Sequence, residues 1–521
     1  MAARSARARI WAAAVLICTV GVASFVTLAL LSSTNDQAQR TGTSRAARLP
    51  VPPARICGNA AVLGGGPAAP PPGAIRVQAG DNARVNWARP GATYWFAPGV
   101  HTLGPGNYAQ IQPGRGSVYV GAPGAVLDGE HRNFYAFGGP APDVRISYLE
   151  IRNFGVRGGN RDEGVVNKDS APGWTIDHSF LTGNAGAALM LGSRSRLTDN
   201  CLKDNQQYGF NAYSPYGIQR IVLLHNEIAG NNTYNWEAYV PECGCTGGGK
   251  FWQVDGAVIK DNWVHGNHGV GMWVDTNDSG FSITGNYFGG NDSWGLIYEI
   301  SYNAQITGNT FVRNGLVSGP RSQGFPTGAI YLSESGADPR VSGPFNRVFQ
   351  VTGNKFVDNW GGVIMWENSN RFCGSPANTS SGSCTLVAPG TATLRACRSG
   401  EINRSPLYAD CRWKTQNVEV SHNLFSFSPA AIGPDCTQKR LCGFQGIFSE
   451  YGSFPSWSPY KGTAVETHIA EQQHNRFVAN TYEGPWRFMV RQLGNIVPWP
   501  VWREMPYDQD DDSTMNPAPA S

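Results

Sequence analysis

The sequence predicts an all-β protein, a single-stranded right-handed parallel β-helix (a solenoid) with loop insertions. Two observations predict it: the composition and an internal repeat. Gly accounts for 64 of 521 residues and charged residues for only 15%, which is typical of a turn-rich β protein. Aromatic residues make up 11%, too many for a disordered chain.

The internal repeat is an asparagine with a large apolar residue two positions later. The copies are Asn200–Leu202, Asn226–Ile228, Asn262–Val264, Asn286–Phe288, Asn309–Phe311, Asn354–Phe356, Asn423–Phe425 and Asn475–Phe477. A second asparagine lies five positions after the first in most copies, at Asn205, Asn231, Asn267, Asn291, Asn314, Asn359 and Asn480. His178, Phe180 and Asn184 form a variant first copy.

The spacing and content of the repeat favour stacked β coils over other solenoids. The cleanest copies, from Asn262 to Asn286 to Asn309, are about two dozen residues apart. Leucine-rich repeats need more Leu, and helical repeats need a 3.6-residue period. Strands of successive coils stack about 4.8 Å apart, so equivalent asparagines can hydrogen-bond to each other and adopt left-handed turn geometry. We therefore interpret the asparagines as scaffold, with the apolar residues in the core.

The chain divides into five predicted regions. Residues 1–9, with Arg4, Arg7 and Arg9, precede an uncharged apolar segment, 10–31, which is long enough to span a bilayer. No A-x-A cleavage site follows, so a retained signal-anchor is favoured over a cleaved signal peptide. Residues 32–73 form a Pro/Gly/Ala-rich linker, 74–505 the β-helix domain, and 506–521 a disordered acidic tail. The predicted location is the cell membrane with the domain outside the cytoplasm, or secretion if the segment is cleaved.

The cysteines agree with export. Cys18 lies in the apolar segment, and the ten others are an even number that predicts disulfides in an oxidising compartment, with open connectivity. No C-x-x-C pair supports a zinc site, and we predict no metal-ligand set. A net charge of +3, without a basic run, predicts no nucleic-acid partner. We expect a monomer.

Several segments resemble the pectate-lyase-like right-handed β-helix superfamily. Residues 94–101 (YWFAPGVH) and 121–129 (GAPGAVLDG) look like its entry coils, and the asparagine repeats look like its coil pattern. The resemblance covers most of residues 75–490 and implies the fold. It leaves the activity open, because the superfamily includes lyases, hydrolases, epimerases and non-enzymes. Residues 174–178 (WTIDH) are similar to a pectate lyase strand, but the R-x-P-x-x-R signature is absent.

Carboxylates recur at one position of the coil. Asp275, Glu299 and Glu367 are each the eighth residue after a second asparagine, and Glu334 closes a similar apolar run. Asp275 and Glu299 belong to adjacent coils and are expected about one strand spacing apart. Two charges so close require a raised pKa, a shared cation such as Ca²⁺, or pairing with Lys or Arg. The sequence leaves these alternatives, and thus the cofactor, open.

The neighbourhood of these acids predicts a carbohydrate site. We assign catalytic roles to Asp275 and Glu299, to Lys250 as a base or charge neutraliser held on a glycine-rich loop, and to His265 as an acid or base. His268 is either a site residue or a turn-stabilising one. The predicted substrate-binding residues are Trp252, Trp273, Trp294, Tyr298, Tyr302, His268, Glu334 and Glu367. The alternative is a solvated acidic ladder with a structural aromatic cluster.

The function predicted from this pattern is a polysaccharide-degrading or polysaccharide-modifying enzyme outside the cytoplasm. A lyase would neutralise a uronate carboxylate and remove its C5 proton. A glycoside hydrolase would use one carboxyl group as acid and another as base or nucleophile. The other reading is a non-catalytic cell-surface glycan-binding protein or adhesin. Insertions at 230–256, 315–327 and 373–415 are expected to form the walls of a glycan groove.

Overall fold

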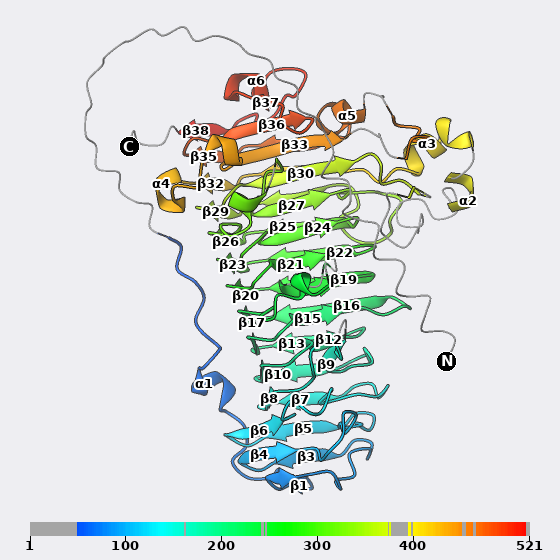
Figure 1. Ribbon diagram of the computed structural model, residues 1–521, viewed down its shortest axis with the longest axis vertical. Helices are drawn as coiled ribbons and strands as arrows, with labels where there is room; N and C mark the ends of the chain where they lie inside the picture. Colours follow the sequence, from blue (N-terminus) through cyan, green and yellow to red (C-terminus); the bar gives the residue numbers. More distant parts are fainter. Residues whose placement is uncertain are drawn as a thin grey trace, which may run out of the picture.

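The computed structural model describes residues 49–160, 163–240, 244, 247–322, 324–373, 375–376, 394–397, 400–450, 455–461 and 465–516. The chain winds through three long sheets that share one axis, with the N-terminal coils at one end and the C-terminal coils at the other (Figure 1). Almost all strand pairs are parallel and connect successive coils, so the predicted right-handed parallel β-helix is confirmed.

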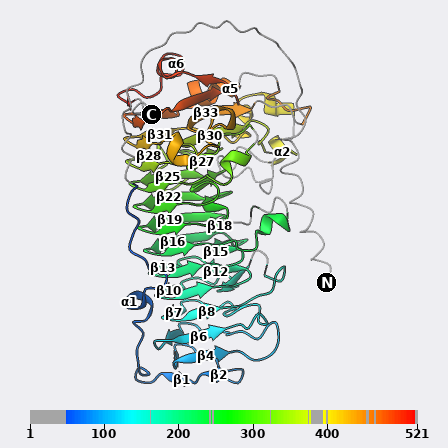
Figure 2. The same ribbon diagram turned by 60° about the vertical axis from the view of Figure 1, so that its left-hand side comes forward.

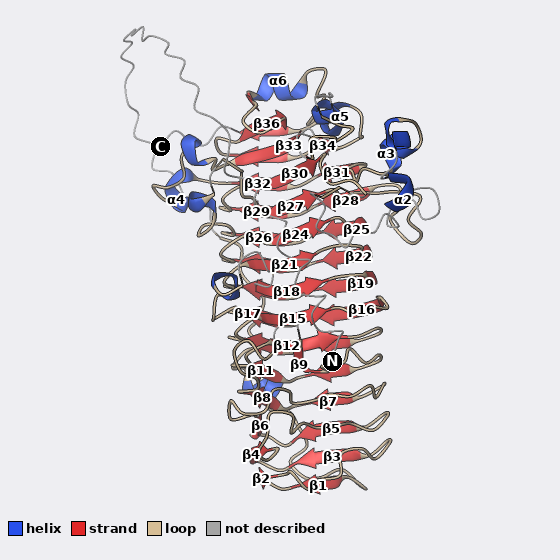
Figure 3. Ribbon diagram, turned by 45° about the vertical axis from the view of Figure 1, so that its right-hand side comes forward, coloured by secondary structure: helices blue, strands red, loops and turns tan. Residues whose placement is uncertain are grey.

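Each full coil contributes one strand to each sheet (Figure 3). The first sheet contains β1 (Ile75–Val77), β3 (Thr93–Phe96), β5 (Val118–Gly121), β7 (Arg145–Ser147), β10 (Thr175–Asp177), β13 (Arg196–Thr198), β16 (Ile218–Leu224), β19 (Val254–Lys260), β22 (Ser279–Thr284), β25 (Tyr302–Thr307), β28 (Phe349–Thr352), β31 (Val418–Ser421) and β34 (Arg476–Val478).

The second sheet follows the first in each coil. It contains β2 (Gly80–Asp81), β4 (Gly99–Thr102), β6 (Ala125–Asp128), β8 (Glu150–Arg152), β11 (Phe180–Thr182), β14 (Cys201–Lys203), β17 (Glu227–Ala229), β20 (Trp263–His265), β23 (Tyr287–Gly289), β26 (Thr310–Val312), β29 (Lys355–Val357), β32 (Leu424–Ser426), β35 (Thr481–Glu483) and β38 (Thr514–Asn516).

The third sheet begins later in the chain and ends in one antiparallel pair. It contains β9 (Gly164–Val166), β12 (Ala187–Leu191), β15 (Tyr208–Ala212), β18 (Gly247–Phe251), β21 (Val270–Val274), β24 (Leu296–Glu299), β27 (Ile330–Ser333), β30 (Val363–Asn368), β33 (Phe444–Glu450), β36 (Arg487–Arg491) and β37 (Ile496–Val497).

Short helices occupy the connections. They are α1 (Ala60–Leu63), η2 (Trp236–Ala238), η3 (Gly319–Arg321), α2 (Leu394–Cys397), η4 (Gly400–Asn403), α3 (Leu407–Asp410), α4 (Pro429–Ile432), η5 (Gln438–Arg440), α5 (Val465–Glu471) and α6 (Trp499–Arg503). Helices α2 and α3 project from one side of the solenoid and α4 from the other (Figure 1).

Two asparagine ladders hold the coils in register. Except at the end of each ladder, the side-chain N–H of a ladder asparagine donates to the Oδ1 of its copy in the next coil, at 2.9–3.1 Å. The same Oδ1 also accepts the backbone N–H of the preceding copy. These bonds satisfy buried polar groups at every turn and confirm the predicted scaffold role. The first ladder runs through Asn200, Asn226, Asn262, Asn286, Asn309, Asn354, Asn423 and Asn480. The second runs through Asn184, Asn205, Asn231, Asn267, Asn291, Asn314 and Asn359.

The left-handed turn geometry falls on the residue before the ladder asparagine, not on the asparagine itself as predicted. Asp199, His225 and Asp261 have φ of 56°, 50° and 55°. Side-chain Cβ atoms disfavour this region by about 1–2 kcal/mol, a cost that short polar side chains partly offset by local hydrogen bonds. Glycine occupies the same position in later coils, as at Gly285. The turn is therefore built from two adjacent residues with separate tasks.

The apolar residue two positions after each first-ladder asparagine stacks in the core. The rings of Phe288, Phe311, Phe356, Phe425 and Tyr482 form a column with centroids 4.5–5.1 Å apart.

Two copies of the predicted repeat were out of register. The last copy is Asn480 with Tyr482, because Asn480, not Asn475, accepts the Asn423 amide. In the variant first copy, Leu181 rather than Phe180 is the core residue, since it pairs with Leu202.

The acidic segment after residue 506, predicted to be disordered, instead completes the fold as far as residue 516. Strand β38 pairs with β35, and Asp510 is fully buried. Its carboxylate accepts hydrogen bonds from Asn480, Tyr482, Trp502 and Ser513. The segment thus ends the first ladder, because Asp510 and Ser513 take over the contacts that a further asparagine would make.

The end of the predicted linker packs on the second sheet. Residues 49–57 run along the side of the solenoid down to α1 (Figure 2). Glu227 accepts the backbone N–H groups of Ile56 and Cys57 at 2.7 and 2.8 Å, and the Tyr287 hydroxyl donates to the Pro50 carbonyl. The Cys57–Cys201 disulfide joins this strap, residues 49–57, to β14.

Two further disulfides, Cys397–Cys411 and Cys436–Cys442, close inserted loops, and Cys373 is also disulfide-bonded. Disulfide formation is thereby confirmed. Cys243, Cys245, Cys384 and the predicted membrane segment at 10–31 lie outside the described residues. Within the part of the chain that the structure describes, no helix is long and apolar enough to cross a bilayer.

We expect Asn286→Ala to destabilise the protein by about 2–4 kcal/mol, because it strands the amide of Asn262 and two backbone groups in the interior. Denaturant unfolding would measure this loss. Asn107→Ala is the control, since Asn107 is exposed. Equal stability of the two variants would contradict a contribution of the asparagine ladder to the free energy of unfolding.

The two disulfides Cys57–Cys201 and Cys436–Cys442 should differ in their effect on stability. The first closes a separation of 144 residues and the second only 6. Chain entropy predicts a loss of roughly 5 kcal/mol for the Cys57→Ser/Cys201→Ser double variant and roughly 2 kcal/mol for Cys436→Ser/Cys442→Ser. Thermal unfolding compares the pairs, and the reverse order would refute the expectation.

Candidate functional site

The outer face of the third sheet carries the predicted carboxylates. Trp273 is in register with Lys250 on one neighbouring strand and with Ile297 on the other. Met272 and Val274, on either side of Trp273, point into the core, so Trp273 and Asp275 face outward. Continuing the register by two residues places Asp275 beside Glu299, with their strands about 4.8 Å apart.

Lys250 neutralises Asp275. Its Nζ lies 2.9 Å from Asp275 Oδ2, donates to the Gly244 carbonyl at 3.1 Å and sits 4.0 Å from the centroid of the Trp273 ring. The two charged side chains expose only 6% and 10% of their surface. The glycines before Lys250 form strand β18 rather than the predicted loop, so Lys250 stands on the sheet itself.

Arg371 neutralises Glu299 and is the main residue that sequence reasoning missed. Its Nη1 donates to Glu299 at 2.5 Å and to Glu334 at 2.6 Å, so it bridges two carboxylates. Arg371 follows β30 at the start of the inserted segment and is 72 residues from Glu299 in the chain. Pairing with Lys and Arg, one of the alternatives left open by the sequence, is therefore present in the structure.

Burial shifts the protonation of the groups around Arg371. It raises the pKa of the Glu334 carboxyl, although Arg371 and Ser333 act in the opposite direction. Burial also opposes the charge of Arg371, but the carboxylates of Glu334 and Glu299 outweigh it, and the pKa of the guanidinium lies well above its ordinary value. The bridge thus joins a permanent cation to Glu334, which is fully buried, and to Glu299, whose side chain is 11% exposed.

Asp278 lies just behind Asp275 and is fully buried. Its Oδ1 accepts the Val254 N–H at 2.7 Å, while Oδ2 is buried without a hydrogen-bond partner. Burial, reinforced by the Asp275 charge, raises the pKa of Asp278 well above its ordinary value. Ionisation of Asp278 in the folded protein therefore lowers the free energy of unfolding.

Four predicted binding residues belong to the interior, and their assignment to the substrate is wrong. Tyr298 and Tyr302 are fully buried, because Tyr298 pairs with Val274 on the inward side of the sheet. Glu334 and Glu367 are also buried. Glu367 forms an ion pair with Arg412 and accepts from Thr415 and Gln473, which ties the inserted segment to the solenoid.

The two predicted histidines, His265 and His268, lie away from Asp275 and Glu299. His265 is on the second sheet, where its Nε2 contacts Glu227 at 3.0 Å and its ring stacks on Trp263 at 4.0 Å. It helps to hold the N-terminal strap through Glu227, so its placement with Asp275 was wrong. His268 is exposed at the turn into β21, with Nδ1 3.2 Å from Asp292.

Aromatic side chains flank the ion pairs. Trp252 and Trp273 are partly exposed, and Trp252 contacts Tyr213 at 5.9 Å on the N-terminal side. On the C-terminal side, the Arg371 guanidinium lies 5.8 Å from the Trp366 ring. Trp294 packs with Tyr331 and Phe325 under the 315–327 insertion. The strand register places Tyr213 and Trp366 in the same outward row as Asp275 and Glu299. Neither residue was predicted from the sequence.

The described residues contain no group of three or more His, Cys, Asp and Glu side chains that could hold a metal ion. On one face, the arrangement offers two carboxylates that expose about a tenth of their side chains, two cations and flat apolar rings. Such a face can stack sugar rings and exchange protons or charge with them.

Comparisons with known proteins bear on the fold. Residues 163–346 match the family model described as "Right handed beta helix region". Together with the three stacked sheets, this match confirms the predicted right-handed parallel β-helix. No curated protein is a significant match.

Several solved structures are similar to this chain at low identity. The A-module of mannuronan C-5 epimerase AlgE6 of Azotobacter vinelandii is 16% identical over 57% of this chain and 80% of its own, with a TM-score of 0.39. For the AlgE4 A-module of the same organism the values are 13%, 67%, 86% and 0.42. For the catalytic domain of Agl-KA they are 9%, 82%, 62% and 0.42.

Asp278→Asn should change the pH dependence of stability. A carboxyl group with a raised folded pKa contributes stability that is present below its unfolded pKa, near 4, and is lost as pH rises through the folded value. The amide keeps the acceptor for Val254 and cannot ionise. We expect the variant to be more stable than the wild type at pH 8 and the difference to shrink toward pH 4, as measured by denaturant midpoints. A difference that grows on acidification would refute this.

Proposed function

We propose that this right-handed β-helix is a polysaccharide-acting enzyme with its reactive centre at Asp275, Glu299 and Lys250, and with Arg371 completing the centre. The observation that carries the proposal is the pair of outward carboxylates on adjacent strands, each matched by a cation. Partly exposed rings at Trp252 and Trp273 supply a flat surface of the kind that a sugar needs. The arrangement is far more specific than a solvated acidic ladder would require.

The charge pattern favours a lyase-type reaction over hydrolysis. Removal of a proton next to a uronate carboxylate needs a base and a positive charge that neutralises the substrate. In the proposed centre, Lys250 and Arg371 would supply that charge by exchanging a carboxylate partner for the carboxylate of the substrate. A hydrolase needs one carboxyl group that carries a proton to the glycosidic oxygen. The pKa is raised for Glu334 and for Asp278, but both acids are fully buried. Asp275 and Glu299, which reach the surface, are both ion-paired.

A non-catalytic glycan-binding protein is the second candidate. The observation that favours it is that Asp275 and Glu299 already have partners and expose only about a tenth of their side chains. In that case the ion pairs would stabilise the face, and the rings alone would bind sugar. For either function we propose a location outside the cytoplasm, with residues 10–31 as the membrane anchor. The disulfides suit an oxidising compartment.

Incubating the full chain with acidic and neutral polysaccharides tests the proposal. A lyase produces the ultraviolet absorbance of a C4–C5 double bond, and a hydrolase produces new reducing ends without it. Deuterium incorporation at C5 in heavy water, without cleavage, would reveal proton exchange alone. Binding without any of these changes would support the glycan-binding alternative.

Glu299→Gln should lower turnover by at least about 10²-fold, because it removes a charged group from the reacting face while keeping its shape. Glu150→Gln is the matched control, since Glu150 lies on β8, far along the solenoid, and pairs with Arg152. Full activity of Glu299→Gln with unchanged unfolding would remove Glu299 from the centre.

A further inference from the structure

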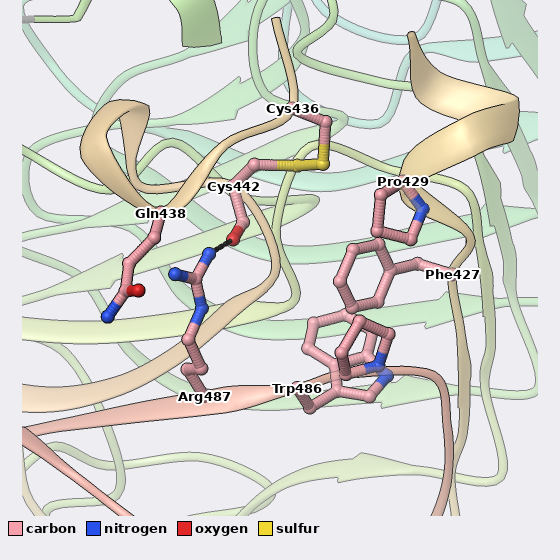
Figure 4. Close-up of a pocket in the computed structure, with 8 residues that line it drawn as sticks. Phe427, Pro429, Cys436, Gln438, Cys442, Trp486 and Arg487 are labelled. Carbon is pink, nitrogen blue, oxygen red and sulfur yellow. Dashed lines mark hydrogen bonds between the residues drawn. A yellow bond between two sulfur atoms is a disulfide. The ribbon is translucent and has the colours of Figure 1, made fainter. Parts of the chain in front are cut away.

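A cavity of about 370 Å³ lies near the C-terminal end of the solenoid, where the second sheet turns into the third. Phe427, which follows β32, and Trp486, which follows β35, form one wall together with Pro429 and Pro485. The opposite side carries Gln438 and Arg487, and the Cys436–Cys442 disulfide crosses the region between them (Figure 4). This volume is at the lower end of the range for small-molecule sites.

The aromatic wall is rigid before any ligand arrives. The Trp486 indole N–H donates to the carbonyls of Phe425 and Glu483, each at 3.1 Å, and its ring packs edge-on against Phe427 at 4.7 Å. The disulfide closes a loop of only a few residues around η5 and thereby holds Gln438 in place. A site whose walls are fixed loses little entropy when it binds a ring.

Arg487 brings an uncompensated positive charge to this cavity. One nitrogen, Nη2, donates to the Cys442 carbonyl, and the guanidinium lies 4.3 Å from the centroid of the Phe444 ring. Among the described residues, no carboxylate forms an ion pair with Arg487, and none of the residues lining the cavity is acidic. Burial accordingly lowers the pKa of Arg487. A half-buried cation that lacks a counter-ion attracts an anion.

We propose that this cavity binds a carboxylate carried on a ring, with the ring against Trp486 and Phe427 and the carboxylate on Arg487 and Gln438. A guanidinium pairs with a carboxylate through two parallel N–H bonds. Nη2 has a second N–H besides the one that it donates to the Cys442 carbonyl, so it can still form such a pair with one neighbouring nitrogen. Aromatic acids and uronic acids share this chemistry. The site lies on other strands than Asp275 and Glu299, so it is independent of the proposed function.

Isothermal titration calorimetry of the full chain with benzoate and with glucuronate tests the site, with benzyl alcohol and glucose as the neutral counterparts. We expect saturable one-to-one binding of at least one acid and none of its neutral counterpart. Binding of benzoate alone assigns an aromatic acid, binding of glucuronate alone a sugar acid, and binding of both the shared chemistry.

Two variants locate the binding. Arg487→Gln removes the cation, and Gln438→Glu places a negative charge opposite it on an exposed turn that the fold does not depend on. Each should weaken binding at least tenfold, whereas Arg503→Gln on α6 should leave it unchanged. No saturable binding of either acid, or binding that Gln438→Glu leaves intact, would overturn the proposal.

Discussion

The asparagine ladders are the interaction on which the rest of the structure depends. Each ladder bond joins a side-chain amide to its copy one coil away, in a buried turn where water cannot compete. A shift by one residue would strand these amides and turn the core residues outward. Register is therefore set at the turns rather than by the strands, many of which are only three residues long. This leaves the outward positions of the third sheet free to vary.

That freedom is used at the candidate site. The third sheet carries Lys250, Trp273, Asp275 and Glu299 in two outward rows, and the ladders hold these rows in line. Two like charges on adjacent strands are tolerated because each has a cation within 3 Å. Lys250 comes from the preceding coil, whereas Arg371 comes from an insertion. That insertion is anchored to the solenoid by the buried Glu367–Arg412 pair. Glu334 and Glu367, which were predicted to bind the substrate, are instead buried and hold Arg371 and Arg412 in place through ion pairs.

The last coil of a repeat protein has no following coil to pair with, so its polar groups need other partners. At the C-terminus, Asp510 and Ser513 accept the last ladder bonds. Along the second sheet, the N-terminal strap is fixed by Glu227, which itself is held by His265, and by the Cys57–Cys201 disulfide. His265, which was predicted to be catalytic, therefore helps to fix the strap through Glu227.

The sequence by itself determined the fold, the coil length and the position of Asp275 beside Glu299 on adjacent strands. These follow from the repeat, because its recurring spacing fixes which residues of successive coils lie next to each other. The sequence also held a signal that was overlooked: Tyr298 immediately precedes Glu299, and alternation along a strand places the two on opposite faces. Only the tertiary structure decided what neutralises the carboxylates, where His265 lies and that the acidic end segment is ordered. Those outcomes depend on insertions and terminal segments, which contact residues far away in the chain and carry no repeat that would reveal their partners.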